Sequence, residues 1–361
     1  MFLIQSKSTA KEFKGQGLMF KVDNNTLTID FQESFGGIPE CTVPWQIQTL
    51  KLIEDFFKEY EFSIPTSGTT GSSKNILVKK EHLLASAKKT NDFFDLKAGD
   101  SSLLVMNPQY IGGRMMIIRA IERKLKLTVL APSNQALQYI NQEYDFCAMV
   151  PMQVQESISN HSDQFKLIKN LIIGGGKVDT TLLQHLRSFE VNCYSTFGMT
   201  ETLSHIALRQ VSPVENKYFE TVEGIDISIK NDCLHIDGKD IGVEGLSTKD
   251  VVRITGNGFQ WLGRQDNMIN SGGVKLFPEV IEEKLSESIK EAFFISTQAD
   301  DKFGQIVILV IESIKTFEPS FPESLNKYEK PKRVYFINKF ERTETGKIKR
   351  LNVLERLGIL Q

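Results

Sequence analysis

The middle of the chain alternates short apolar runs with amphipathic segments, and this alternation constrains the fold most. Continuous apolar runs occur at 103–106, 127–130, 146–150 and 171–173, and helical spacing of apolar residues occurs near 114–123, 134–142 and 179–189. Strands that are apolar on both faces are typical of parallel sheets covered by helices on both sides. The sequence therefore predicts an α/β fold built on a largely parallel sheet.

The residues before this region predict a hairpin, a helix and a second hairpin. Apolar and polar residues alternate over 18–22 and 27–31 around the turn residues 23–25. Pro44 suits a first helical position, and apolar residues follow at helical spacing up to Tyr60. A strand is also expected at 75–78, so the segment 66–74 is predicted to be a hairpin tip, with a helix over 81–94 after it.

From about residue 210 the pattern changes to short strands separated by Gly, Asp and Asn. Strands at 225–229, 233–236, 250–254 and 259–262 predict an all-β subdomain over about 210–262. A helix from Pro278, strands at 292–296, 305–311 and 333–337, and a last helix then predict a small α+β domain.

Composition excludes several classes of function. The 361 residues contain 43 Lys and Arg against 45 Asp and Glu, a net charge of -2, which gives no general attraction to nucleic acid or anionic lipid. The four cysteines form no C-x-x-C pair, so buried free thiols are expected rather than a zinc or redox site. No signal-peptide segment or run of 18 apolar residues occurs, which favours a cytoplasmic protein.

The segment from Thr66 to Lys74 has the composition of a phosphate-binding loop. Glycines let successive backbone N–H groups point at one anion, hydroxyl groups donate further hydrogen bonds, and a lysine adds a positive charge. It is not a Walker A loop, because the glycine spacing differs and a strand follows instead of a helix. On composition alone, an ordinary solvated turn is an equally good interpretation.

Three later segments favour the phosphate loop: Phe197-Gly198-Met199-Thr200-Glu201-Thr202, Gly263-Arg264-Gln265-Asp266 and Thr343-Glu344-Thr345-Gly346-Lys347. In this order and spacing, the four segments resemble the acyl-adenylate-forming superfamily, which contains acyl- and aryl-CoA ligases, luciferases and peptide-synthetase adenylation domains. The resemblance runs from about residue 62 to the C-terminus. It implies a large N-terminal α/β domain over 1–265 that binds ATP and an acid, and a mobile C-terminal α+β domain over 266–361. Only 65 residues precede the loop, which implies a trimmed N-terminal subdomain.

The resemblance also implies a reaction in two halves. A carboxylate attacks the α-phosphate of ATP to give acyl-AMP and diphosphate, and the thiol of coenzyme A then displaces AMP. The implied phosphate-binding residues are Ser67, Gly68, Thr69, Thr70, Gly71 and Lys74. The implied adenine, ribose and phosphate contacts elsewhere are Gly175, Gly176, Ser195, Thr196, Phe197, Gly198, Asp250 and Arg264.

Six further residues receive roles from the resemblance. Thr200 lies near the α-phosphate, Glu201 binds Mg²⁺, and Lys347 bridges the attacking carboxylate and the α-phosphate during adenylation. Asp266 is the hinge of the C-terminal domain, and Gly272 and Gly273 let the pantetheine arm of coenzyme A pass. Two positions depart from the family, which usually has proline where Ser73 and Glu341 stand.

Two segments, 110–114 and 195–209, look like the corresponding stretches of short bacterial o-succinylbenzoate-CoA ligases. This resemblance implies an aromatic acid with a second carboxylate and a place in menaquinone biosynthesis. The implied acid-site residues are Tyr110, Gly112, Gly113, Arg114 and His205. The two glycines would leave room for a flat ring, and Arg114, Arg119 or a helix N-terminus would hold the spare carboxylate. Both arginines are equally compatible with solvated helix charges, and His205 with a core residue.

Several functions stay open on the sequence alone. The first is an AMP-forming acid-CoA ligase whose partners are an acid, ATP and coenzyme A, with Mg²⁺ and without nucleic acid. Its acid could also be a benzoate or a fatty acid. The second is an adenylating enzyme that loads a carrier-protein pantetheine, and the third is a non-catalytic nucleotide-binding protein. The oligomeric state, monomer or homodimer, stays open as well.

Overall fold

The protein forms two compact units. The computed structural model describes residues 11–14, 19–22, 25–32, 38–39, 41–65, 75–286, 288–342 and 348–359. Unit 1 comprises Met1–Val178, His185–Asp226 and Asp237–Gly245, and unit 2 comprises Asp179–Gln184, Ile227–Ile236 and Leu246–Gln361. The expected division into 1–265 and 266–361 concerns the movement of one part against the other, and it stays a prediction.

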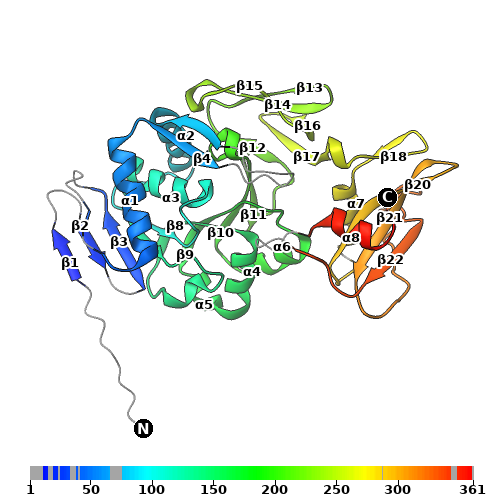
Figure 1. Ribbon diagram of the computed structural model, residues 1–361, viewed down its shortest axis with the longest axis horizontal. Coiled ribbons are helices and arrows are strands. Elements are labelled where there is room, and N and C mark those ends of the chain that lie inside the picture. The colour runs from blue at the N-terminus through cyan, green and yellow to red at the C-terminus, as the bar shows by residue number, and fades with distance from the viewer. Residues whose placement is uncertain are drawn as a thin grey trace, which may run out of the picture. The chain divides into compact units, whose positions relative to one another are not determined.

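Unit 1 is built on a mixed sheet in which the strands follow the order β1-β2-β3-β7-β6-β8-β9-β10-β11-β12 (Figure 1). The strands are β1 (Lys11–Lys14), β2 (Met19–Val22), β3 (Thr26–Asp30), β6 (Ser101–Leu104), β7 (Lys126–Leu130), β8 (Tyr144–Met149), β9 (Ile168–Ile173), β10 (Asn192–Gly198), β11 (His205–Ser212) and β12 (Phe219–Thr221). Strands β7, β6, β8, β9 and β10 are parallel, whereas β3 and β11 pair antiparallel with β7 and β10. The predicted parallel sheet is confirmed, and antiparallel strands extend it on both sides.

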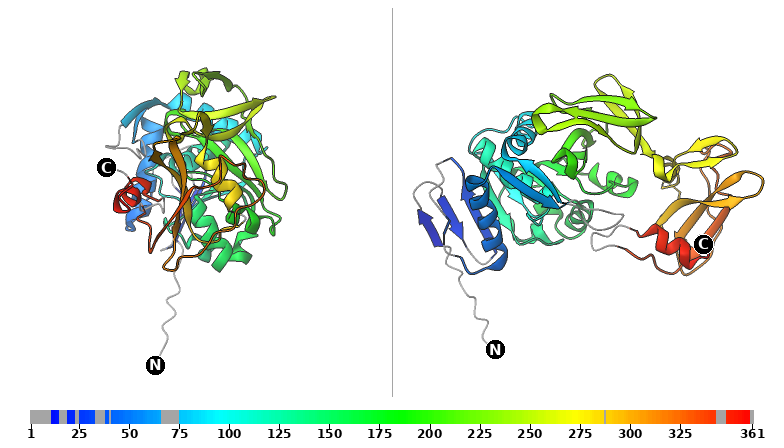
Figure 2. Two further views of the ribbon diagram at one scale, coloured as in Figure 1. Left: turned by 90° about the vertical axis from the view of Figure 1, so that its right-hand side faces the viewer. Right: turned by 45° about the horizontal axis from the view of Figure 1, so that its top comes forward.

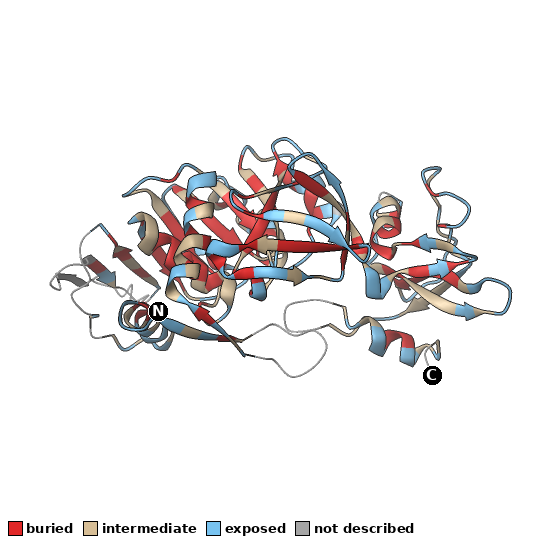
Figure 3. Ribbon diagram, turned by 90° about the horizontal axis from the view of Figure 1, so that it is seen from above, coloured by how far each residue is buried: buried red, intermediate tan, exposed pale blue. Residues whose placement is uncertain are grey.

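Helices separate these strands along the chain, and the apolar runs supply the buried centre of the sheet (Figure 3). The helices are α1 (Pro44–Lys58), α2 (Lys80–Phe93), α3 (Ile111–Arg123), α4 (Pro151–Asn160), α5 (Ser162–Phe165) and α6 (Thr180–Leu186). Helix α1 lies beside the first strands (Figure 2), and the Gln46 amide donates to the Thr26 carbonyl of β3 at 3.2 Å.

Two segments of unit 1 differ from the sequence-based expectation. The region 134–142 forms only the 3-10 turn η1 (Ala136–Tyr139), because turn-forming Ser and Asn residues on both sides leave too few positions for a helix. Helix α4 is not predicted by the apolar pattern. It begins at Pro151, whose fixed φ suits a first helical position.

The second hairpin is confirmed up to its tip. Strands β4 (Glu61–Pro65) and β5 (Asn75–Lys79) pair antiparallel, with Pro65 opposite Asn75. The tip between them, Thr66 to Lys74, lies outside the described residues.

The chain after β12 contains mostly short strands separated by turns, as predicted. The strands are β13 (Asp226–Lys230), β14 (Cys233–Gly238), β15 (Val243–Ser247), β16 (Asp250–Thr255), β17 (Gly258–Arg264), β18 (Ile269–Ser271), β19 (Val274–Leu276), β20 (Phe293–Asp300), β21 (Gly304–Glu312) and β22 (Arg333–Ile337). The helical segments are η3 (Lys239–Ile241), η4 (Gln265–Asn267), α7 (Pro278–Leu285) and α8 (Arg350–Arg356). Strands β15, β18 and β19 are too short or too polar to be predicted.

The last five strands make one sheet of unit 2 with an apolar core on each face. One core gathers Ile281 and Leu285 of α7 against Leu309 of β21, and the other gathers Phe294 of β20 against Val353 of α8. Apolar residues therefore alternate between the two faces along β20 and β21, as expected of strands that are covered on both sides.

Two expectations from composition bear on the whole chain. The cysteines are free, and Cys147, Cys193 and Cys233 are buried while Cys41 is half-buried. Burial raises the pKa of these three buried thiols, which suits inert core positions. Within the described part of the chain, no helix is long and apolar enough to cross a membrane.

Candidate active site

Two neighbouring parallel strands of unit 1 end side by side and carry two of the predicted nucleotide-binding segments. Ile173, at the end of β9, stands opposite Ser195 on β10. The Thr196 hydroxyl donates to the Ile173 carbonyl at 3.3 Å, and a side chain on Gly174 would come within 2.7 Å of that hydroxyl. The glycine turn after β9 and the end of β10 therefore meet at the carboxyl edge of the sheet, where open α/β folds bind ligands.

The predicted nucleotide residues in these segments differ in exposure. Gly175 and Gly176 are exposed, and Gly175 has a φ of +75°, which favours glycine. Phe197 is half-buried, with its ring centroid 5.9 Å from that of Phe219. Ser195 is buried, so its side chain faces the interior more than the ligand edge.

The chain reverses tightly between β10 and β11, and Thr200 and Glu201 lie at this reversal. A side chain on Gly198 would lie 2.2 Å from the Ser204 carbonyl oxygen, so only glycine fits. The Thr202 hydroxyl oxygen accepts from the Met199 N–H at 3.0 Å and lies 2.7 Å from the Ser204 carbonyl oxygen, which holds the turn closed.

Glu201 is the candidate metal ligand at this turn. Its side chain is exposed, whereas Thr200 beside it is buried. Among the residues that the structure describes, no group of three His, Cys, Asp or Glu side chains could hold an ion. Mg²⁺ in nucleotide sites is commonly held by one or two carboxylates together with substrate phosphates and water. A single exposed carboxylate beside a nucleotide segment fits this arrangement.

His205, at the start of β11, belongs to a buried polar network with α2 and α3. Its Nε2 lies 3.2 Å from the Thr90 hydroxyl of α2, and its Nδ1 lies 3.4 Å from the Ser204 hydroxyl. The Arg119 guanidinium of α3 donates to the same Ser204 hydroxyl at 2.7 Å. The network adjoins the turn at Gly198, so it lies next to the predicted nucleotide segment.

Arg119 is a buried cation without a carboxylate partner among the described residues. Its side chain is 1% exposed, it lies over the Phe146 ring at 5.9 Å, and its Nε has no hydrogen-bond partner. Burial lowers the pKa of Arg119 to about 9, so it stays charged at neutral pH. Burial, and secondly the charge of Arg119, hold the pKa of His205 well below its usual value. The network therefore contains one fixed positive charge and a neutral imidazole.

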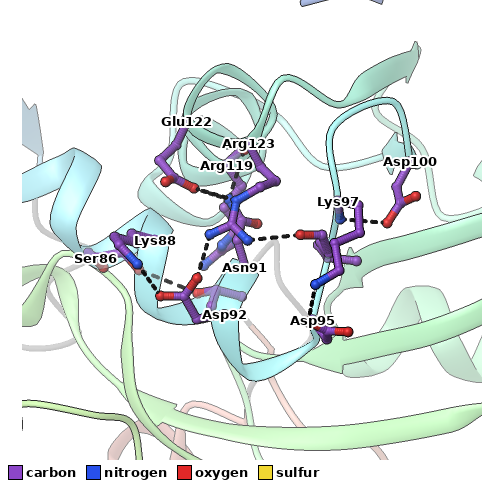
Figure 4. A network of polar contacts seen from close by, with 12 residues as sticks. Ser86, Lys88, Asn91, Asp92, Asp95, Lys97, Asp100, Arg119, Glu122 and Arg123 are labelled. Carbon is purple, nitrogen blue, oxygen red and sulfur yellow. Dashed lines mark hydrogen bonds and ion pairs between the residues drawn. The ribbon is translucent and has the colours of Figure 1, made fainter. Parts of the chain in front are cut away.

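A set of polar contacts fixes α3 against α2 and thereby places Arg119 (Figure 4). The Asn91 amide of α2 donates to the backbone carbonyl of Arg119 at 3.0 Å and to the Glu122 carboxylate at 2.7 Å. Arg123 pairs with Asp92 of α2, one turn beyond Arg119. Arg119 is therefore not a solvated helix charge, which settles one of the alternatives that the sequence leaves open.

The other predicted acid-site residues surround the start of α3 but do not all join this network. Tyr110 precedes the helix and is exposed, and a side chain on Gly112 would reach Met106 at 3.5 Å. A side chain on Gly113 would lie 2.5 Å from the Asn107 carbonyl oxygen. The expectation that Gly113 leaves room for a ring is therefore wrong, because the backbone of Asn107 fills that space.

Arg114 contacts a different part of unit 1 from Arg119. It lines a pocket with Asp55 of α1 and Ile117 of α3, and the structure does not join it to the network around His205. Five helical residues correspond to a rotation of about 140°, so the two arginines leave α3 in different directions.

Three predicted residues lie together in unit 2. Asp250 of β16 is buried and accepts from the Trp261 indole N–H at 2.9 Å, and it stands opposite Arg264 in the β16–β17 pair. The Arg264 guanidinium donates twice to Asp266, at 2.9 Å each, and Lys249 lies 3.4 Å from the same carboxylate. The hydrogen bonds from Arg264 hold the pKa of Asp266 below its usual value. The predicted hinge carboxylate is thus tied to the predicted phosphate ligand.

Gly272 and Gly273 form the turn between β18 and β19. Their φ values are +59° and +84°, which side chains rarely adopt, so the turn itself requires glycine. A side chain on Gly272 would contact Phe303 at 3.4 Å, whereas Gly273 faces open space.

Several predicted residues lie outside the described part of the chain: Ser67, Gly68, Thr69, Thr70, Gly71, Ser73, Lys74 and Lys347. Glu341, the second departure from the family pattern, is half-buried and pairs with Lys349 at 2.5 Å. The Asn352 amide of α8 donates to the same carboxylate at 3.1 Å, so Glu341 ties the predicted catalytic segment to the last helix.

Sequence reasoning misses three residues of these networks. Ser204 bridges Arg119 and His205, and its place beside His205 is the signal that could have found it. Thr90 contacts a predicted residue that is remote in sequence, Trp261 contacts Asp250 across one strand pair, and no motif marks either of them.

The fold and these segments agree with comparisons to known proteins. A sequence profile of the family described as AMP-binding enzyme matches residues 62–233. The crystal structure of an acyl-CoA synthetase (AMP-forming)/AMP-acid ligase II-like protein from Dyadobacter fermentans DSM 18053 has 33% sequence identity and a TM-score of 0.62. The match covers 89% of this chain and 96% of that chain.

Two further relatives carry more specific names. The 2-succinylbenzoate–CoA ligase of Lactococcus lactis subsp. lactis is 24% identical over 314 residues, which cover 79% of this chain and 68% of the relative. The o-succinylbenzoate CoA synthetase (MenE) of Bacillus subtilis, in complex with the acyl-adenylate intermediate OSB-AMP, is 21% identical with a TM-score of 0.68. That match covers 81% of this chain and 68% of that chain and shows a shared fold. The chain belongs to the AMP-binding enzyme family and has the adenylate-forming fold.

Proposed function

We propose that the protein is an AMP-forming acid-CoA ligase whose acid is o-succinylbenzoate. It converts ATP, the acid and coenzyme A into the acyl-CoA, AMP and diphosphate through an acyl-adenylate. The names of the relatives from Lactococcus lactis and Bacillus subtilis support this substrate. We propose a place in menaquinone biosynthesis from that acid, and a location in the cytoplasm.

The buried charge of Arg119 is the observation that carries the substrate proposal. A cation inside a protein costs free energy unless an anion or hydrogen bonds compensate it. Within the described residues no carboxylate pairs with Arg119, and its Nε has no partner. The only carboxylate of a monocarboxylic acid reacts with the α-phosphate of ATP, so the charge of Arg119 stays uncompensated. An acid with a second carboxylate compensates it.

The geometry suits an indirect contact to that second carboxylate. Ser204 is half-buried and lies between Arg119 and the more open turn at Gly198. Because His205 is neutral, the network adds no second positive charge, and the Ser204 hydroxyl can donate its proton to a carboxylate while Arg119 donates to the hydroxyl oxygen. We assign Arg119 the charge that selects the acid, and Ser204 the hydroxyl nearer to it.

The nucleotide half of the reaction is assigned to the carboxyl edge of the unit 1 sheet. Gly175, Gly176 and Phe197 would hold adenine, and Thr200 would donate to the α-phosphate. Glu201 would hold Mg²⁺, which neutralises charge on the phosphate oxygens. The phosphate loop 66–74 would hold the β- and γ-phosphates. None of these groups acts as a nucleophile, so the chemistry rests on positioning and charge.

The remaining assignments concern residues of unit 2. Asp250 would accept from the ribose hydroxyls through the oxygen that Trp261 does not occupy. Lys347 would bridge the carboxylate and the α-phosphate during adenylation, and Gly272 and Gly273 would admit pantetheine during thioester formation. Asp266 would be the pivot between these two poses.

A substrate panel tests the proposal. Formation of acyl-CoA and AMP is measured with ATP, Mg²⁺ and coenzyme A across o-succinylbenzoate, benzoates and medium-chain fatty acids. We expect the highest kcat/KM for o-succinylbenzoate. A fatty acid with an equal or higher kcat/KM would refute the substrate, and AMP formation without free acyl-CoA would refute coenzyme A as the acceptor.

A further inference from the structure

Unit 1 contains a pocket whose described lining includes none of the predicted nucleotide residues. Its volume is about 340 Å³, within the range of small-molecule sites. Helices α1, α2 and α3 and strand β4 contribute its walls. Among the described residues, Arg114 is the only predicted acid-site residue that lines it.

The floor of this pocket is apolar and aromatic. The lining apolar residues are Leu52, Phe56, Phe62, Leu83, Ile117 and Ile118. The Phe56 and Phe62 rings are nearly parallel, with centroids 5.5 Å apart, and the Lys80 ammonium lies 5.3 Å from the Phe56 centroid. Leu83, Ile117 and Ile118 are almost completely buried, so the floor is rigidly packed from below. Such a floor binds an apolar body of moderate size.

Arg114 supplies one charged group at this floor. Its Nε is buried and has no hydrogen-bond partner, and the guanidinium forms no ion pair within the described part of the chain. Burial lowers the pKa of Arg114, while the more distant charge of Asp55 acts in the opposite direction. A desolvated guanidinium with a free donor fits a ligand carboxylate, which it can bind through two parallel hydrogen bonds.

Carboxylates supply the opposite charge at the rim. Asp55 is held by Lys51 of the same helix at 3.2 Å. Glu59 and Glu61 are exposed, line the pocket, and form no ion pair with any described residue. These two carboxylates fit an ammonium group, and they repel a ligand that carries negative charge alone. The charge of Glu59 also acts on Lys58 and Lys80, without an ion pair to either. The acid substrate, ATP and coenzyme A are therefore poor occupants.

We infer that this pocket binds a free α-amino acid with a large apolar side chain. Its carboxylate pairs with Arg114, its ammonium group with Glu59 and Glu61, and its side chain lies on the Phe56–Phe62 floor. An apolar acid would leave the rim carboxylates without a cation, and an apolar amine would leave Arg114 without an anion. Only the zwitterion satisfies all three groups. This inference does not depend on the proposed ligase function.

Calorimetric titration of the full chain with L-phenylalanine tests the inference. The comparison ligands each lack one group: phenylacetate lacks the ammonium group, phenethylamine the carboxylate, and glycine the apolar body. We expect L-phenylalanine to bind at least about tenfold more tightly than each of them, the size of one charge-assisted hydrogen bond. The inference would be overturned if L-phenylalanine did not bind at about 10 mM, a concentration about 100-fold above a dissociation constant of 100 µM. It would also be overturned if phenethylamine bound as tightly as L-phenylalanine.

Two variants locate the ligand. Arg114→Gln, and separately Glu59→Gln with Glu61→Gln, should each weaken L-phenylalanine binding about tenfold or more. Glu143→Gln is the matched control, because Glu143 is an exposed carboxylate of unit 1 outside the pocket. This variant should bind L-phenylalanine with the same affinity as the parent protein. The Glu59 and Glu61 changes are on the surface, so they test the site even if Arg114→Gln does not fold. Unchanged affinity in the folded variants would place the ligand elsewhere.

Discussion

Replacement of Arg119 by methionine should change substrate selection while leaving the free energy of unfolding almost unchanged. The cost of burying this charge follows from its pKa, which burial lowers from 12.5 to about 9. A shift of this size corresponds to about 5 kcal/mol at neutral pH, since each pKa unit is about 1.4 kcal/mol. The hydrogen bond to Ser204 and the contact with Phe146 offset about 2 to 4 kcal/mol of that cost. Burial of Arg119 therefore contributes little net stability.

Methionine has a similar length, no charge and a flexible side chain that fills the same space. Arg119→Met should therefore leave the free energy of unfolding within about 1 kcal/mol of the parent protein, or raise it. Stability would rise with pH only above about 9 in the parent, where the folded protein alone releases the Arg119 proton. Urea unfolding at pH 7.5 measures the difference between the two proteins.

The same substitution should reduce activity with the dicarboxylic acid selectively. Loss of one hydrogen bond to a charged group costs about 1.5 to 3 kcal/mol, or about 10- to 150-fold in kcat/KM. We expect this loss for o-succinylbenzoate and less than about threefold for benzoate, which has no second carboxylate for Arg119 and Ser204 to hold.

Arg123→Met on the same helix is the crossed control. Arg123 pairs with Asp92 and donates to the Leu96 carbonyl at 2.8 Å, so its loss should lower stability without changing the ratio of the two substrates. Equal losses for both acids in Arg119→Met, together with a large loss of stability, would refute the assignment. Arg119 would then be a structural residue.

Three further predictions concern His205, Lys347 and Asp266. Because the pKa of His205 lies well below its usual value, the unfolded chain binds more protons under acid conditions. Stability should therefore fall as the pH drops below about 6.5, and His205→Asn should remove that part of the slope in urea unfolding between pH 5 and 7.5. Lys347→Ala should slow adenylation by two to three orders of magnitude, roughly 3 to 4 kcal/mol, while synthetic acyl-AMP and coenzyme A still react; equal loss in both steps would contradict its role. Asp266→Pro fixes φ near about -65° and should impair one half-reaction more than the other, whereas equal rates in both would exclude a hinge there.

Much of the fold is predictable because local pattern and tertiary structure agree. Strands β6 to β9 are continuous apolar runs, and they pair in parallel as such runs predict. The region 134–142 fails for a local reason as well, since its flanking Ser and Asn residues favour turns. The short strands β18 and β19 cannot be found by periodicity, because three residues contain less than two periods of a strand.

The candidate site is less predictable, because its networks join residues that are far apart in sequence. Motif spacing identifies Gly175, Phe197 and Glu201, but it does not identify the residues that contact them. It gives no sign that Thr90 of α2 approaches His205, or that Trp261 occupies one oxygen of Asp250. For Gly113, motif reasoning predicts space for a ligand where the structure has protein backbone. Its conformation and space are decided by Asn107, not by a ligand.

The two arginines of α3 show why a charge in a helix cannot be assigned from sequence. Both interrupt an apolar stretch, and both would read as solvated charges on an amphipathic helix. Helix geometry separates the two arginine side chains by a rotation of about 140°, but it does not predict which residues each of them contacts. Asn91 and Glu122 fix the helix so that Arg119 enters the core beside Ser204, while Arg114 enters a pocket rimmed by carboxylates. The same residue type thus presents a lone positive charge on one side of α3 and half of a zwitterion site on the other.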